Sequence, residues 1–109
     1  MNSVQRRLFR AFVESGGDLT HEAAVDLLIQ QVNASVWVMP PKVKRALQLA
    51  LHAEDQLCYS DLAKQLSGEE AESVTEPAFR QRVSRGVRAL ETVIRTRRWT
   101  TVPAQAQAC

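Results

Sequence analysis

The sequence predicts an all-α fold of about five helices, the last of which is the longest and the most basic. Apolar residues recur every three or four positions along most of the chain, which is the period of an amphipathic helix. No strand-like pattern extends beyond four residues. The 109 residues, 45% hydrophobic and 24% charged, have the balance of one small soluble domain. Only 6% are aromatic, so the core must be built from Leu, Val, Ala and Ile.

The first helix is expected over residues 3–15 and the second from about residue 20 to residue 32. Their apolar stripes are Val4, Leu8, Ala11 and Phe12, and then Ala24, Val25, Leu28, Ile29 and Val32. Gly16 and Gly17 separate the two helices, since glycine commonly follows a helix end. Asp18 or Thr20 can cap the second. We expect this two-helix segment, residues 1–38, to serve in dimerisation or in contact with a regulator.

A third helix is expected to open at Pro40-Pro41, because proline is accepted in a first turn. Its apolar stripe is Val43, Ala46, Leu47, Ala50 and Leu51. Residues 36–39 before it predict a linker packed on the core. A short fourth helix is expected from Ser60, its predicted cap, to Leu66. Residues 67–73 then predict a polar, acidic loop.

The fifth helix begins with Thr75-Glu76-Pro77, which combines a capping hydroxyl, an acid that complements the helix dipole, and a first-turn proline. It is expected to reach about residue 97, with residues 100–109 as a flexible tail. At 100° per residue, its two faces differ in chemistry. Apolar residues share one face, where Gly86 would admit a close neighbouring helix. The opposite face carries Arg80, Gln81, Ser84, Arg85 and Arg88.

The net charge of +2 hides a strong asymmetry along the chain. Residues 1–76 hold seven Lys and Arg against eleven Asp and Glu, a balance of −4. Residues 77–109 hold seven Arg against one acid, a balance of +6. Such a separation is typical of a chain with one end that binds a polyanion. Arg, Gln and Ser are also the residue types that reach phosphates and base edges in the major groove.

A short helix, a connection and a long basic helix form the order of a helix-turn-helix motif. Three blocks carry a closer likeness: MPPKVKRALQL (residues 39–49), LCYSDLAKQL (57–66) and VTEPAFRQRVSRGVRALE (74–91). In this order they resemble region four, the C-terminal helix-turn-helix domain, of bacterial sigma factors, nearest to the extracytoplasmic-function group. The resemblance covers residues 39–99. Residues 1–38 are too short for region two, so we expect that the chain is not a complete sigma factor.

The resemblance implies promoter binding, contact with RNA polymerase, or both. The leading hypothesis is a small cytoplasmic transcriptional regulator that places its fifth helix in the major groove of double-stranded DNA, with a homodimer matching two half-sites. The candidate DNA-binding residues are Arg80, Gln81, Ser84 and Arg85 toward bases, Arg82, Arg88 and Arg95 toward phosphates, and the cap Thr75.

The alternative is a region-four mimic that binds RNA polymerase, or a sigma or anti-sigma partner, without reading DNA. The long, acidic turn favours this alternative, because acids beside a recognition helix repel phosphate. Its candidate partner-binding residues are Glu69, Glu70, Glu72, Trp37 and Trp99. Each tryptophan has a structural reading as well: Trp37 as a lid on the core and Trp99 as a plug at a helix end.

Other classes of function find no support in the sequence. No Ser/His/Asp set, paired-carboxylate cleft or glycine-rich phosphate loop is present, so we expect neither an enzyme nor a cofactor. Cys58, Cys109, His21 and His52 lack the spacing of a zinc site. No apolar run approaches the ~20 residues of a membrane helix. Two cysteines form no disulfide framework, which favours a cytoplasmic location.

Overall fold

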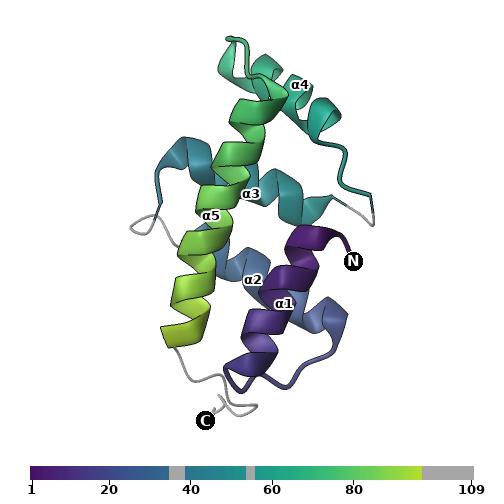
Figure 1. Cartoon of the computed structure of the whole chain (residues 1–109), viewed down its shortest axis with the longest axis vertical. Coiled ribbons are helices and arrows are strands. Elements are labelled where there is room, and N and C mark those ends of the chain that lie inside the picture. Colours follow the sequence, from purple (N-terminus) through teal and green to yellow (C-terminus); the bar gives the residue numbers. More distant parts are fainter. Residues whose placement is uncertain (35–38, 54–55, 97–109) are drawn as a thin grey trace.

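Five α-helices make up the described part of the chain, as the sequence predicts, and no strand occurs in it. The computed structural model describes residues 1–34, 39–53 and 56–96. The helices are α1 (Ser3–Glu14), α2 (His21–Ala34), α3 (Pro41–His52), α4 (Tyr59–Glu70) and α5 (Glu76–Thr96). α5 runs along the long axis of the molecule, with α4 across one end and α1 beside its other half (Figure 1).

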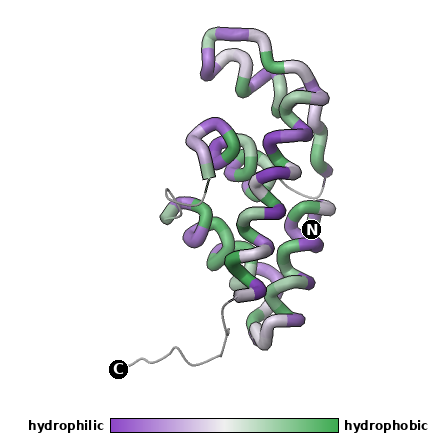
Figure 2. Tube along the Cα trace, turned by 60° about the vertical axis from the view of Figure 1, so that its left-hand side comes forward, coloured by the Kyte–Doolittle hydropathy of each residue, from purple (hydrophilic) through white to green (hydrophobic). Residues whose placement is uncertain are grey.

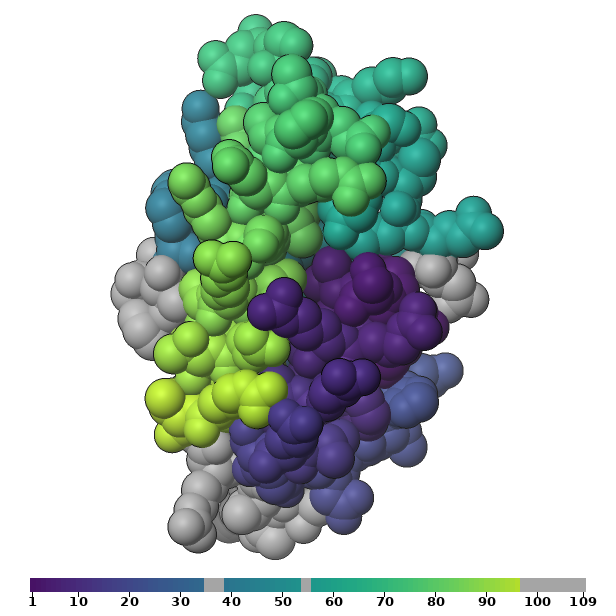
Figure 3. Space-filling model, viewed as in Figure 1, coloured from purple at the N-terminus to yellow at the C-terminus, as the bar shows by residue number. Residues whose placement is uncertain are grey.

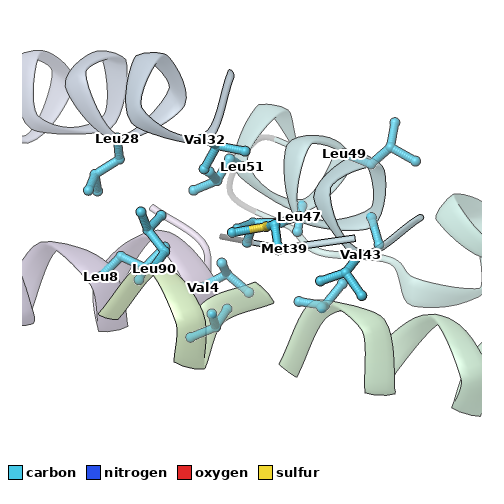
Figure 4. Close-up of a cluster of buried hydrophobic side chains, with 14 of the residues drawn as sticks. Val4, Leu8, Leu28, Val32, Met39, Val43, Leu47, Leu49, Leu51 and Leu90 are labelled. Carbon is cyan, nitrogen blue, oxygen red and sulfur yellow. The ribbon is translucent and has the colours of Figure 1, made fainter. Parts of the chain in front are cut away.

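The predicted apolar stripes meet in one continuous hydrophobic cluster, except for Val25, which is only partly buried and lies outside it. Each helix contributes a leucine that is fully buried: Leu8, Leu28, Leu47, Leu66 and Leu90, from α1 to α5 in order. Figure 4 shows labelled side chains from α1, α2, α3 and α5 converging on the cluster, and hydrophobic and hydrophilic stretches alternate along the helices in Figure 2. The buried stripes of α1 and α2 therefore lie inside the molecule, where they complete the core.

The most extensive helix–helix contact joins α3 and α5, which cross near the middle of the molecule (Figure 1). Gly86 is buried at this crossing. A Cβ atom at this position would lie 3.0 Å from Leu47 Cβ and 3.4 Å from Val43 Cγ1. Carbon atoms prefer separations of about 3.5–4.0 Å, so the crossing leaves no room for a larger residue. The prediction that Gly86 admits a neighbouring helix is confirmed.

Two buried amides attach the start of α1 to the end of α3. Asn2 caps α1 in a capping box with Gln5, in which each side chain accepts a hydrogen bond from the other's backbone N–H. Asn2 Nδ2 donates to the carbonyl oxygens of Ala50 (2.9 Å) and Ala53 (3.1 Å), and Gln5 Nε2 donates to that of Leu51 (2.8 Å). Carbonyls at a helix end lack intrahelical partners, and these amides supply them. α1 is thereby fixed beside α5.

The fourth helix differs most from its prediction. It begins at Tyr59 and has no side-chain cap, so Ser60 lies in the first turn and the predicted cap is wrong. It also continues through Gly68 to Glu70, so more than half of the predicted acidic loop is helical. The connection to α5 is consequently residues 71–75, and it begins at Ala71, which has a left-handed conformation with φ of 55°.

Tertiary contacts explain why α4 continues past Ser67 and Gly68, where the sequence predicts that it has ended. The Ser67 hydroxyl donates to the carbonyl of Ala63 (2.8 Å) and accepts from the backbone N–H of Val74 (2.8 Å), which ties the last turn to the following segment. Glu69 and Glu70 in the same turn form ion pairs with arginines of α3 and α5. These contacts offset the cost of Gly68, which is about 1 kcal/mol relative to alanine inside a helix.

The remaining boundaries agree with the sequence or lie outside the described residues. Thr20 caps α2, since its Oγ1 accepts from the backbone N–H of Ala23 (3.3 Å). Gly16, at the end of α1, has a φ of 95° that favours glycine. Met39 is buried, as expected for the linker, whereas residues 36–38 and the predicted tail at 100–109 lie outside the described residues.

Candidate nucleic-acid interface

The start of α5 is built as the sequence predicts. The Thr75 hydroxyl accepts a hydrogen bond from the backbone N–H of Ala78 (3.2 Å), so this candidate DNA-binding residue acts as the N-terminal cap. Glu76 and Pro77 occupy the first turn, where an acid and a proline stabilise a helix. The first turn of the candidate recognition helix is therefore fixed by its own sequence.

An aromatic contact positions this first turn against α4. The Phe79 ring is fully buried and meets the ring of Tyr59 edge to face, with 5.9 Å between centroids. The guanidinium of Arg80 lies over the Tyr59 ring, 4.1 Å from its centroid. Arg80 also forms an ion pair with Glu76 at 3.0 Å, and its side chain is 56% exposed. Arg80 is thus accessible and held in one orientation.

A strip of three donor side chains on α5 faces solvent. Gln81, Arg85 and Arg88 are exposed and are spaced as i, i+4 and i+7, so they lie in a row along one side of the helix. Within the described part of the chain, none of the three side chains forms a hydrogen bond or an ion pair. We call these three residues the donor strip. They can bind an external partner without breaking any hydrogen bond or ion pair to the described residues.

Two arginines predicted to contact phosphates instead form ion pairs with side chains of other helices. Arg82 points toward α4, where its Nη1 donates to Glu70 at 2.6 Å, and its side chain is only 20% exposed. Arg95 pairs with Glu14 of α1 at 2.8 Å and lies 4.0 Å from Glu91. Both residues are placed to hold helices together. Ser84, predicted to face bases, is half-buried beside α1.

The acidic residues of the predicted partner surface lie opposite cations of the same chain. Arg45 forms two hydrogen bonds with Glu69 (2.8 and 2.9 Å), which raise the pKa of the arginine and lower the pKa of the glutamate. Lys42 lies 3.2 Å from Glu72 and 3.9 Å from Glu70. We call this cluster the acid–base corner: its cations are Lys42, Arg45 and Arg82, and its acids are Glu69, Glu70 and Glu72. The three cations offset the negative charge of the turn. Trp37 and Trp99, the other two candidates for this surface, lie outside the described residues.

Sequence reasoning missed the basic side of α1. Arg6, Arg7 and Arg10 are exposed on α1, which lies beside α5 on the face seen in Figure 3. Arg7 donates through Nε and Nη2 to Glu91 (3.2 and 3.1 Å), and these hydrogen bonds raise the pKa of Arg7. The sequence held a signal for this surface, because three arginines precede the first acid of the chain, Glu14.

α3 carries three cations and no acid, and α1 and α5 together carry a larger positive balance. They carry eight arginines against three glutamates, a balance of +5, whereas the whole chain has a net charge of +2. α2 and α4, by contrast, each carry more acids than bases. Because Lys42 and Arg45 of α3 are paired with glutamates of α4 and the turn, we take the surface along α1 and α5 as the candidate for binding a polyanion.

Comparison of the chain with models of known families, with curated proteins and with solved structures gives no match. Among the described residues, no helix is long and apolar enough to cross a membrane. In the same residues, no group of three or more His, Cys, Asp and Glu side chains is arranged to hold a metal ion.

Proposed function

We propose that this chain is a DNA-binding transcriptional regulator that inserts the N-terminal half of α5 into the major groove. The donor strip carries this proposal. A major groove about 12 Å wide admits an α-helix, and Gln and Arg are the residue types that bond adenine and guanine edges with two hydrogen bonds. Gln81 and Arg85 are assigned to bases and Arg88 to a backbone phosphate.

The arrangement of α4 and α5 supports the same assignment. α4 lies across the N-terminal end of α5, joined to it by the five residues 71–75, which is the order of a helix-turn-helix unit (Figure 1). The acid–base corner lies on the α3 side of this unit, so the acids of the turn are matched by Lys42, Arg45 and Arg82. The resemblance of residues 39–99 to sigma region four makes promoter DNA the expected target.

The alternative function, binding to RNA polymerase or to a sigma or anti-sigma partner without reading DNA, drew its support from an acidic turn. The acidic turn gives this alternative less support in the folded chain, because Glu69, Glu70 and Glu72 have partners within the molecule. A pull-down with core polymerase in the presence of nuclease separates the two functions. Retention on polymerase, combined with the absence of DNA binding, would overturn the proposal.

Fluorescence anisotropy with duplexes selected from a random library tests the proposal directly. Arg85→Ala is expected to lower the affinity for the selected duplex roughly 5- to 150-fold and to relax the preference at one base pair. Arg88→Ala is expected to weaken all duplexes alike and to reduce the slope of log K against log salt by about 1.

The matched control is Lys64→Ala, which removes one exposed cation of α4 that makes no ion pair with the described residues. Its affinity is expected to stay within a factor of about two of the wild type. Equal losses in Arg85→Ala and Lys64→Ala would show that only the overall charge matters. In that case the donor strip would not read sequence.

A further inference from the structure

A groove separates α1 from the junction of α4 and α5, and its lining is rich in hydrogen-bond donors. It has a volume of about 260 Å³ and is lined by Ser3, Val4, Arg7, Tyr59, Arg80, Val83, Ser84 and Val87. This is several times the roughly 30 Å³ that one water molecule occupies in the liquid. None of these lining residues is acidic. The polar side chains therefore comprise two guanidinium groups, two aliphatic hydroxyls and one phenol.

The donors of the groove have unused capacity. An arginine has five N–H donors. Arg7 donates through Nε and Nη2 to Glu91. Arg80 donates through Nε to Glu76, and its Nη2 lies 3.0 Å from the same carboxylate oxygen. Both Nη1 groups therefore make no hydrogen bond within the described part of the chain. The hydroxyls of Ser3 and Ser84 likewise bond no described residue. These four groups come from α1 and α5, the two helices with the +5 balance.

The position of each arginine is fixed before any ligand arrives. Glu91 holds Arg7 from one side, and its own pKa is lowered chiefly by the hydrogen bonds from Arg7. Arg80 is held between Glu76 and the ring of Tyr59. A guanidinium that is already oriented loses less entropy when it binds a planar or tetrahedral oxyanion. The groove therefore has oriented cations and free hydroxyls at one place.

We propose that this groove binds a phosphate group, through Arg7, Arg80, Ser3 and Ser84. Arginine and serine side chains both donate hydrogen bonds to phosphate oxygens, and those from an arginine pair are charge-assisted. The phosphate belongs either to the DNA backbone or to a small phosphorylated ligand. The first source rests on the proposed function and would add a contact from α1 to the interface. The second source does not depend on it.

Ser84→Glu is the test variant, because it places a carboxylate inside the groove. Its matched control is Thr92→Glu, which adds the same charge at an exposed position of α5 outside the groove lining. Inorganic phosphate is titrated into each protein at constant ionic strength, and backbone amide shifts are followed by NMR. We expect saturable shifts at Ser3, Arg7 and Ser84 in the wild type and at least a tenfold weaker response in Ser84→Glu than in Thr92→Glu.

Because Ser84 is half-buried, a second variant guards against a folding defect. Arg80→Gln changes an exposed side chain, and Lys64→Gln is its control with the same change of charge. Thermal unfolding by circular dichroism verifies that each pair folds alike. If phosphate produces no saturable shifts at the groove, or if chloride produces the same shifts, the proposal is overturned. Equal responses in Arg80→Gln and Lys64→Gln would overturn it too.

A second arm of the experiment identifies the source of the phosphate. The four variants are titrated against the selected duplex by anisotropy. A loss of DNA affinity of about tenfold in Ser84→Glu, beyond that in Thr92→Glu, assigns the groove to a backbone phosphate. Phosphate binding at the groove with DNA affinity equal in the two variants assigns it to a small ligand. Phosphate binding by a wild type that binds no DNA would overturn the proposed function alone.

Discussion

Two contacts of different chemistry hold the N-terminal half of α5: its crossing with α3 and the acid–base corner that it shares with α3 and α4. At the crossing, Gly86 sits against Leu47 and Val43 with no space for a further carbon atom. At the corner, Arg82–Glu70 and Arg45–Glu69 are ion pairs whose side chains keep 15–43% of their exposure. Close packing fails abruptly when a group is added, whereas partly exposed ion pairs are individually weak. The crossing therefore sets where α5 lies, and the corner adjusts where its first turns point.

The largest expected effect comes from filling the crossing. Gly86→Val is expected to lower the free energy of unfolding by about 2–3 kcal/mol, because its side chain would have to displace Leu47 or Val43. Urea unfolding followed by circular dichroism measures the loss. Gly68→Ala is the control, since no atom lies within 4 Å of a Cβ there, and it should stabilise α4 by about 0.5–1 kcal/mol. Similar changes in the two variants would mean that the crossing is not tightly packed.

A second test addresses the attachment of α1 to α3. This contact uses polar groups, as the acid–base corner does, but its groups are buried, as those at the α3–α5 crossing are. Asn2→Ala removes a cap and leaves the carbonyl of Ala50 without its amide donor, while that of Ala53 keeps only the longer hydrogen bond from Gln5 Nε2 (3.3 Å). The expected loss of unfolding free energy is about 2 kcal/mol. Asn33→Ala is the control, because its side chain accepts one exposed hydrogen bond from Gln48, and it should cost less than about 0.5 kcal/mol. A difference too small to measure would show that the buried amides add nothing to stability.

Sequence reasoning could predict this fold where the signals are local. The stripe of α5 and the cap at Thr75 depend on spacing and on neighbours in sequence, and both are confirmed. The end of α4 could not be predicted, because Gly68 and three glutamates resemble a loop unless the arginines that pair with Glu69 and Glu70 are known. Arg45 is 24 residues from Glu69 in the sequence, and Arg82 is 12 residues from Glu70.

The candidate interface was predictable only in part for the same reason. A helical wheel separates the apolar face of α5 from its polar face, but it cannot show which arginines have partners on other helices. Arg82 and Arg85 are both candidate DNA-binding residues by sequence, yet one is paired with Glu70 and the other belongs to the donor strip. The position of α1 beside α5 depends on Asn2 and Gln5 reaching α3, which no pattern along the chain reveals.

The acid–base corner itself gives a smaller effect. Arg82→Met is expected to destabilise the protein by about 1–2 kcal/mol, because it leaves the Glu70 side chain, which is only 15% exposed, without its closest cation. Adding Glu70→Gln to this variant should restore part of the loss. The same double-mutant cycle on Arg45 and Glu69, a more exposed pair, is expected to show weaker coupling. A stronger coupling for the exposed pair would reverse the order assigned to the two pairs.

The smallest effect is a pH dependence at the α1–α5 contact. Hydrogen bonds from Arg7, aided by the charges of Arg7 and Arg95, lower the pKa of Glu91 from its ordinary value of 4.5, while partial burial opposes the shift. A carboxyl group with a lower pKa in the folded protein adds stability above its unfolded pKa and loses it as the pH falls through its folded pKa. Glu91→Gln should therefore cost about 0.5–1 kcal/mol at pH 7.

The difference between the wild type and Glu91→Gln is then expected to shrink as the pH falls from about 4.5 toward 3. Urea unfolding at pH 7, 5, 4 and 3 measures it. Asp26→Asn serves as the control, because Asp26 is exposed on α2 and forms no ion pair with the described residues. A constant difference across this range would mean that Glu91 contributes through packing. Arg7 would then be held at the phosphate groove by contacts other than this ion pair.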